Sequence, residues 1–345
     1  MSFSKRLLQF YRQKARSLPW RRDRDPYKIW LSEIMLQQTR VVTVVEYFHR
    51  FLEKYPTVED LAASQEDEVL KLWQGLGYYS RARNMRRAAQ VIVADYGGQF
   101  PKSARELRKL PGIGPYTAGA IASIAFNEKV AAVDGNALRV MSRIHALEED
   151  IAREKTRALV GRLMEEAMEE DYGAFNQALM DLGSEICTPK SPRCDSCPVR
   201  GDCRALEEGR VLDFPVKSTK KPPKREKYTV LVVEMDGDFL LQQRPDQGLL
   251  ASLYTFPMVP GHLAEEDVLK LALEEDFIVE ELLALEGRIH RFTHKIWDMR
   301  AYYLRALPFP HEEGRLWASR RELREIYAIP TAHMPFVEEV SKDEF

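Results

Sequence analysis

All four cysteines of this 345-residue chain lie in one short segment. Their spacing is C-x6-C-x2-C-x5-C, at Cys187, Cys194, Cys197 and Cys203. A disulfide framework in a secreted protein would distribute its cysteines along the chain. Thiols gathered this closely are typical of a site for a metal ion or an iron–sulfur cluster.

Three interpretations of this cysteine segment remain open. A 4Fe–4S cluster needs four thiolates and can be wrapped by one compact loop, so the spacing favours it. Zinc usually takes two C-x2-C pairs, and only one is present. Free thiols are the third alternative. We predict one 4Fe–4S cluster as the cofactor, bound within 187–203.

Charge is distributed unevenly along the chain. Residues 1–227 contain 39 Lys and Arg against 31 Asp and Glu, whereas residues 228–345 contain 12 against 22. The difference predicts two domains with different partners, and a basic first domain suits a polyanion. The alternative is uneven surface charge without functional meaning. The sequence lacks a long apolar run and a secretory signal, so we predict neither a transmembrane helix nor export.

The spacing of apolar residues changes once along the chain. Intervals of three and four predict helices in the first part, within 4–15, 27–48, 82–95 and 154–170. Alternation of apolar and polar residues predicts strands in the last part, within 228–235, 238–245 and 288–307. Two helices are predicted among these strands, at 265–276 and 319–327.

This change predicts a division into two domains. We expect a mainly α-helical domain over 1–215 and a smaller α+β domain over 228–345. The segment 216–227 between them is basic and contains prolines, which indicates a linker.

A glycine turn between two predicted helices can hold a phosphate. Gly112, Ile113 and Gly114 follow Pro111 and precede a helix that begins near Pro115. Glycines let the backbone approach a ligand closely, and amides at a helix N-terminus attract anions. The pattern is that of a helix-hairpin-helix, which binds DNA backbone without reading sequence. A plain turn between helices is the alternative.

Two acids in the predicted helical domain suit the removal of a base from DNA. Glu33 has apolar neighbours in WLSEIMLQQT, so burial should raise its pKa and keep it protonated near neutral pH. Asp134 precedes a predicted helix in VDGN. Paired carboxylates of this kind divide acid and charge-stabilising roles in glycoside hydrolysis. The alternatives are an exposed helix residue for Glu33 and an N-cap for Asp134.

Several motifs together resemble adenine DNA glycosylases of the MutY type. They occur in the order LPWRRDRDPYKIWLSEIMLQQT, WQGLGYYSRARN, LPGIGPYTAGAI, AVDGNALRV, FNQALMDLG and the four-cysteine loop. The resemblance implies a helix-hairpin-helix domain with a 4Fe–4S cluster, and a Nudix-like domain that helps to recognise 8-oxoguanine. It implies removal of adenine mispaired with 8-oxoguanine or guanine in double-stranded DNA.

The resemblance also assigns roles to residues of this chain. The implied catalytic residues are Glu33, Asp134, Tyr116 and Asn136. The implied adenine pocket contains Trp20, Arg21 and Gln177. The implied DNA contacts are Gln38, Tyr78, Gly112, Ile113 and Gly114. For Gln38 and Tyr78, ordinary surface and core packing is the alternative.

The second domain departs from its family pattern in two places. Lys270-Leu271 stands where a Nudix hydrolase would have an Arg-Glu pair, so nucleotide hydrolysis is not expected. Phe292, Thr293 and His294 resemble the Phe-Ser-His loop that contacts 8-oxoguanine, with Thr in place of Ser. A strand turn without a DNA role is the alternative.

We therefore expect a monofunctional glycosylase that acts as a monomer in the cytoplasm, where the DNA is. Tyr116 stands where bifunctional relatives carry a Schiff-base lysine, so lyase activity is not expected. Two rivals remain: a bifunctional glycosylase/lyase of the endonuclease III type, and a non-catalytic iron–sulfur protein that binds DNA.

Overall fold

The computed structural model describes residues 1–218, 222–307 and 315–342. Contacts divide the chain into two units. The first unit comprises Met1–Ala63 and Asn84–Thr219, and the second comprises Ser64–Arg83 and Lys220–Phe345. The segment 64–83 thus groups with the C-terminal residues. None of the helices in the described part has the length and hydrophobicity that a bilayer-spanning helix needs.

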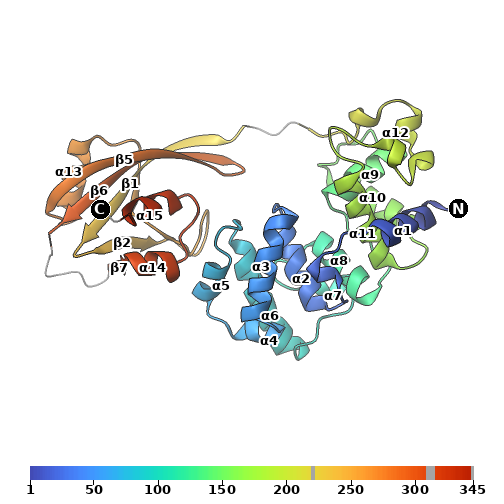
Figure 1. Ribbon diagram of the computed structural model, residues 1–345, viewed down its shortest axis with the longest axis horizontal. Helices are drawn as coiled ribbons and strands as arrows, with labels where there is room; N and C mark the ends of the chain where they lie inside the picture. The colour runs from blue at the N-terminus through green and yellow to red at the C-terminus, as the bar shows by residue number, and fades with distance from the viewer. Residues whose placement is uncertain (219–221, 308–314, 343–345) are drawn as a thin grey trace. The chain divides into compact units, whose positions relative to one another are not determined.

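The first unit is built of helices (Figure 1). The longer ones are α1 (Phe3–Lys14), α2 (Pro26–Leu36), α3 (Val41–Lys54), α6 (Ser80–Tyr96), α8 (Pro115–Phe126), α9 (Gly135–His145), α10 (Glu154–Ala167) and α11 (Tyr172–Glu185). Helix α6 begins in the second unit and continues into the first. The shorter ones are α4 (Val58–Ala63), α7 (Ala104–Leu107), α12 (Arg204–Glu207) and the 3-10 turns η1 (Pro19–Arg21), η2 (Cys194–Ser196), η3 (Arg200–Asp202) and η4 (Val211–Asp213).

Helix α2 lies in the interior of this unit. Its residues from Ile29 to Met35 are all buried, as expected of a helix that is apolar on nearly every side. The apolar stretch predicted over 27–48 is not one helix, because the chain turns between α2 and α3. Gln38 in this turn has a φ of 59°, which a helix does not allow.

The helix-hairpin-helix turn connects α7 to α8. Gly112 has a φ of +73°, and a Cβ atom there would lie 2.6 Å from the Cβ of Asn84. This position therefore requires glycine. Ile113 between the two glycines is buried, and its amide donates to the carbonyl of Leu110. Gly114 caps α8 with an ordinary φ of −83°.

A sheet with helices on both faces forms most of the second unit (Figure 1). Its strand order is β3-β2-β1-β6-β5, with β4 beside β1 and β7 beside β2. The strands are β1 (Lys224–Met235), β2 (Asp238–Gln243), β3 (Tyr254–Thr255), β4 (Met258–Pro260), β5 (Val279–Arg291), β6 (Lys295–Ala306) and β7 (Leu316–Ser319). The helices are α5 (Glu66–Leu72), α13 (Glu265–Glu274), α14 (Arg320–Glu325) and α15 (Met334–Val340).

Alternation along β1 explains the two cores of this unit. Val230 and Val232 point to one face and pack in a cluster with residues of α14 and α15. Leu231 and Val233 point to the other face and pack in a cluster with α13. A period of two buries both faces of a central strand in this way.

Strand β1 begins at Lys224, inside the segment 216–227 that the sequence predicted as a linker. Lys224–Lys227 form the start of β1 and pair in parallel with the start of β6. Glu226 accepts from Lys295, and Arg225 donates to Asp298, so opposite charges stabilise this highly charged pairing. Residues 219–221 of the predicted linker lie outside the described residues.

Candidate active site

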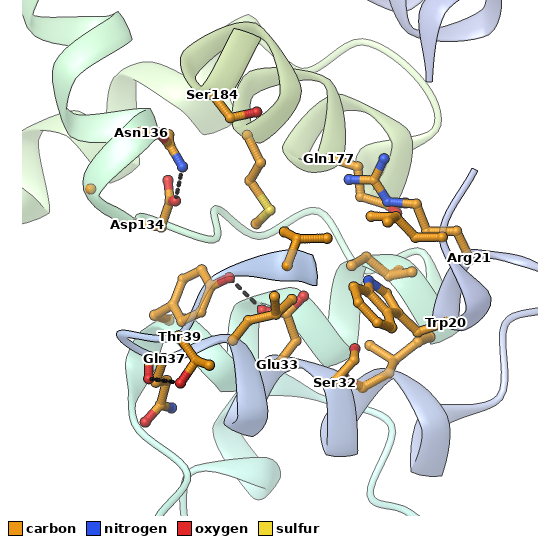
Figure 2. A pocket seen from close by; sticks show the side chains of 18 of the residues that line it. Trp20, Arg21, Ser32, Glu33, Gln37, Thr39, Asp134, Asn136, Gln177 and Ser184 are labelled. Atoms are coloured by element: carbon orange, nitrogen blue, oxygen red, sulfur yellow. Dashed lines mark hydrogen bonds between the residues drawn. The ribbon is translucent and has the colours of Figure 1, made fainter. Parts of the chain in front are cut away.

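A cavity of about 610 Å³ opens in the first unit (Figure 2). Its lining comes from η1, α2, α8, α11 and the turn before α9, which are far apart in sequence. Eight of the predicted site residues line it together: Trp20, Arg21, Glu33, Gln38, Tyr116, Asp134, Asn136 and Gln177. Its size lies within the range of small-ligand sites in proteins.

Glu33 lies on the wall of the cavity that α2 provides, and its residue is only 5% exposed. The Tyr116 hydroxyl donates a hydrogen bond to its carboxyl Oε2. Burial raises the pKa of Glu33 to about 7; Tyr116 and the Arg21 charge oppose this shift, and the Asp134 charge adds to it. A proton therefore resides on Glu33 in a large fraction of molecules at neutral pH.

Asp134 lies on a different wall, beside Asn136 (Figure 2). It is the N-cap of α9, and its Oδ1 accepts from the amide of Ala137 at 2.6 Å. Its Oδ2 accepts from the Asn136 side chain at 2.8 Å. Burial raises the pKa of Asp134 overall, although both donors and the charge of Arg139 oppose this shift. Asp134 is thus a helix cap and a cavity residue at once.

These two carboxyl groups have different environments. Glu33 is enclosed by apolar side chains with one hydroxyl donor, whereas Asp134 accepts from an amide and an Asn side chain. Such a pair can supply a proton at one wall and a fixed negative charge at another. The arrangement suits the heterolysis of a glycosidic bond between a base and a sugar.

Two residues of this site were missed by the sequence analysis. Asp181 of α11 is fully buried and accepts hydrogen bonds from Arg16 and Arg21, both of which line the cavity. The available signal was an aspartate inside the apolar motif FNQALMDLG, because a buried acid needs cationic partners. Arg16 lies in an irregular segment without any pattern that distinguishes it.

A second cavity, of about 290 Å³, lies within the second unit. Its lining includes Tyr78 and the predicted triplet Phe292, Thr293 and His294, which forms the turn of the β5–β6 hairpin. The Tyr78 hydroxyl and the Thr293 hydroxyl hydrogen-bond to each other. The structure thus brings Tyr78 and the triplet together, whereas Gly112, Ile113 and Gly114 are not among the described lining residues of either cavity.

Gln38 and Tyr78 share an uncommon backbone conformation. Their φ angles are 59° and 47°, in the left-handed region that non-glycine residues seldom occupy. Both side chains are exposed. Such conformations persist where the surrounding fold enforces them, and they gather at functional sites.

The four cysteines surround one small apolar pocket after α11. The thiols lie close enough for their charges to interact, and Cys187, Cys197 and Cys203 pack against the helical core. Burial, together with the charges of the other three thiols, raises the pKa of Cys197 to about 11. Four converging thiolates are therefore unfavourable unless a cationic centre binds them, which fits an iron–sulfur cluster.

Two arginines of α9 hold this cysteine segment and were also missed. Arg143 is buried and donates to the Cys187 sulfur at 3.2 Å and to the carbonyls of Thr188, Pro189 and Phe214. Arg139 donates to the Cys187 carbonyl and to the Asn136 side chain. The signal was a pair of arginines four residues apart on one helix face after VDGN.

Three segments of the chain match known families. Residues 31–166 match the HhH-GPD superfamily base excision DNA repair protein family. Residues 187–203 match the iron-sulfur binding domain of endonuclease III, and residues 228–339 match the NUDIX domain. The predicted architecture is confirmed: a helical glycosylase-type domain with an iron–sulfur segment is followed by a Nudix-like domain. The cofactor of the chain is one 4Fe–4S cluster.

Relatives extend this similarity over the whole chain. An adenine DNA glycosylase of Mus musculus is 38% identical over 79% of this chain, and the match spans only 64% of that relative. An adenine DNA glycosylase of Buchnera aphidicola subsp. Acyrthosiphon pisum (strain APS) is 31% identical over 99% of both chains. The solved structure of a thermostable thymine-DNA glycosylase is 31% identical over 60% of this chain and 95% of its own, with a TM-score of 0.54.

The helical fold and the cavity with two carboxyl groups define a protein of the DNA glycosylase class. The chain belongs to the adenine DNA glycosylase family.

Proposed function

We propose that the chain is a monofunctional adenine DNA glycosylase that removes adenine mispaired with 8-oxoguanine or guanine in double-stranded DNA. The observation that carries this proposal is the shared cavity of Glu33 and Asp134, in which the pKa of one carboxyl is about 7. The names of the relatives support adenine as the base.

The chemistry follows from the placement of the two acids. Glu33 donates its proton to N7 of the extruded adenine. The bond between C1′ and N9 then breaks, and its electron pair leaves with the base. The Asp134 carboxylate stabilises the positive charge that develops on the sugar. Water adds to C1′ and gives a proton to the Glu33 carboxylate, which leaves an abasic site and regenerates the acid.

The other predicted residues take supporting roles in this proposal. Tyr116 orients the Glu33 carboxyl, and Asn136 orients Asp134. Trp20, Arg21 and Gln177 contact the extruded adenine. Gly112, Ile113 and Gly114 bind backbone phosphate, and Gln38 and Tyr78 enter the duplex when the adenine leaves it. Phe292, Thr293 and His294 recognise 8-oxoguanine on the opposite strand.

The region 1–215 carries out the reaction in this proposal, and 228–345 recognises the opposite base. The chain acts as a monomer in the cytoplasm with the DNA. A lyase step would need an amine nucleophile for a Schiff base. Among the residues that the structure describes, no lysine lines the cavity of Glu33 and Asp134, which supports the monofunctional reaction.

An excision assay tests this proposal. The purified full chain is incubated with duplexes that hold A opposite 8-oxoguanine, G or T, and strand cleavage is measured with and without alkali. We expect alkali-dependent cleavage at A opposite 8-oxoguanine and G, with little at A opposite T. Absence of adenine release would refute the proposal, and cleavage without alkali, trapped by borohydride, would favour the bifunctional rival.

A further inference from the structure

Asp181 joins two arginines at the wall of the catalytic cavity. The Asp181 carboxylate is fully buried. It accepts from the Arg16 Nε at 2.7 Å and from the two terminal nitrogens of Arg21 at 2.6 and 3.0 Å. The contact with Arg21 is bidentate, the geometry that best fixes the plane of a guanidinium group.

Arg21 has a second acid within electrostatic range. Burial lowers the pKa of Arg21, but the hydrogen bond and charge of Asp181 outweigh it and Glu33 contributes further, so the pKa is raised overall. Conversely, the charge of Arg21 acts on Glu33 and lowers its pKa. Both acids thus stabilise the charge of one guanidinium, which lines the cavity together with Glu33 and donates its hydrogen bonds to Asp181.

We propose that Asp181 is a positioning residue that holds the Arg21 guanidinium against α11 and thereby keeps Glu33 in its protonated, acid-competent form. The inference rests on the proposed function, in which Glu33 is the general acid. Asp181 itself touches neither base nor sugar in this proposal and acts only through Arg21.

The reason is the effect of a nearby cation on a carboxyl group. An unpaired guanidinium beside Glu33 would stabilise the carboxylate and lower its pKa. The Tyr116 hydroxyl from α8 and the Asp134 carboxyl before α9 also act on Glu33. Arg16 and Arg157 line the same cavity, but the cation whose charge lowers the pKa of Glu33 is Arg21. Arg21 is thus the positive charge that must be neutralised if burial is to keep the pKa of Glu33 near 7.

The substitution Asp181→Asn tests this directly, because it keeps the shape of the side chain and removes its charge. Single-turnover excision from an A·8-oxoguanine duplex is measured from about pH 5 to about pH 9 with enzyme in excess. The wild-type rate should fall as pH rises through about 7, since the acid must be protonated. In Asp181→Asn this fall should begin about one pH unit lower, so the rate above neutrality drops about ten-fold while the rate at acidic pH is largely kept.

Two further variants separate this role from a merely structural one. The double variant Asp181→Asn with Arg21→Gln lacks the released cation. The fall of its excision rate with rising pH, here called the alkaline limb of the pH–rate profile, should return toward the wild-type position. Arg16→Gln removes the other partner of Asp181, and its limb should stay in place. Circular dichroism and the visible absorption of the cluster establish that each variant is folded.

The outcomes distinguish this inference from the function on which it rests. A folded Asp181→Asn variant with an unmoved limb, or with an equal loss of rate at every pH, overturns the positioning role. If Asp181→Asn does not fold, Arg21→Gln alone decides: its limb should move to higher pH, and an unmoved limb overturns the inference. A wild-type chain that releases no adenine at any pH refutes the proposed function instead.

Discussion

The cavity of the first unit and the cavity of the second unit use polar side chains in opposite ways. In the first, Glu33 lines the cavity and Asp181 binds two of its arginines; both acids are buried, and each has hydrogen-bond partners within the protein. In the second, Thr293 and His294 are exposed on a hairpin turn, and the Thr293 hydroxyl hydrogen-bonds to Tyr78, which is itself exposed. The polar groups of the first site are thus buried and hydrogen-bonded within the protein, whereas those of the second site are accessible from outside.

This difference in burial indicates which cavity suits acid catalysis and which suits recognition of a base. A carboxyl that must donate a proton near neutral pH needs low polarity and fixed neighbours, which only a buried site supplies. A residue that reads a base in DNA must reach it, so it belongs on an exposed turn held by a rigid sheet. Substitutions in the first cavity should therefore change the rate, and those in the second should change the selectivity.

The largest effect should come from Glu33→Gln, which removes the proton donor and preserves the size of the side chain. We expect single-turnover excision from an A·8-oxoguanine duplex to fall on the order of a thousand-fold, because general acid catalysis contributes about that much. Duplex binding, measured by fluorescence anisotropy, should change little.

The matched control is Glu53→Gln, at an exposed position of α3. It should excise adenine at the wild-type rate. If Glu33→Gln keeps the wild-type rate, the first cavity is not the site of chemistry. The proposed division between a catalytic first cavity and a recognition role for the second is then wrong. Equal losses of binding and excision would instead give Glu33 a role in recognition.

Local patterns predicted much of the fold and the residues that depend on local context. The predicted strands at 228–235 and 238–245 correspond to β1 and β2, apart from the earlier start of β1 at Lys224 and the earlier end of β2 at Gln243. The burial of Glu33 followed from its apolar neighbours, and the cap position of Asp134 followed from the helix after VDGN. These properties depend on residues within a few positions along the chain, so they can be predicted from periodicity and capping chemistry.

Other features depend on contacts that no local pattern records. Asp181 is buried with hydrogen-bond partners because two arginines about 160 residues away in the sequence donate to its carboxylate. The segment 64–83 groups with the C-terminal residues through contacts such as that of Lys71 with the carbonyl of Tyr327. The shared cavity of Glu33 and Asp134 was expected through chemistry and family resemblance, since sequence spacing alone gives no distance between them.

A smaller effect should come from Arg143→Met, which tests how far the first cavity depends on the cysteine segment. Helix α9 begins at the Asp134 cap and carries Arg143 near its other end, where four acceptors of the loop region bind the guanidinium. Loss of these hydrogen bonds should lower the free energy of unfolding by about 3 kcal/mol. Urea titration followed by circular dichroism and by cluster absorption measures this change.

We expect Arg143→Met to lose cluster and excision activity in the same proportion, with activity per cluster unchanged. The exposed Arg162 of α10 offers the control Arg162→Met, which should keep both. Full cluster content and unchanged stability in Arg143→Met would show that the rigidity of the first cavity does not depend on this arginine.

The smallest effect should come from Thr293→Ala, because it removes one exposed hydroxyl from a turn whose backbone is otherwise held. Phe292 packs on Trp297 with ring centroids 4.9 Å apart, so the turn should keep its position in the variant. A single neutral hydrogen bond contributes about 1 kcal/mol, which corresponds to a roughly five-fold loss in the preference for A·8-oxoguanine over A·G duplexes. The rate on A·G duplexes should stay the same.

Thr293→Ser keeps the hydroxyl and should keep the preference. Equal losses on both duplexes would place Thr293 in the catalytic step and remove the contrast between the two cavities.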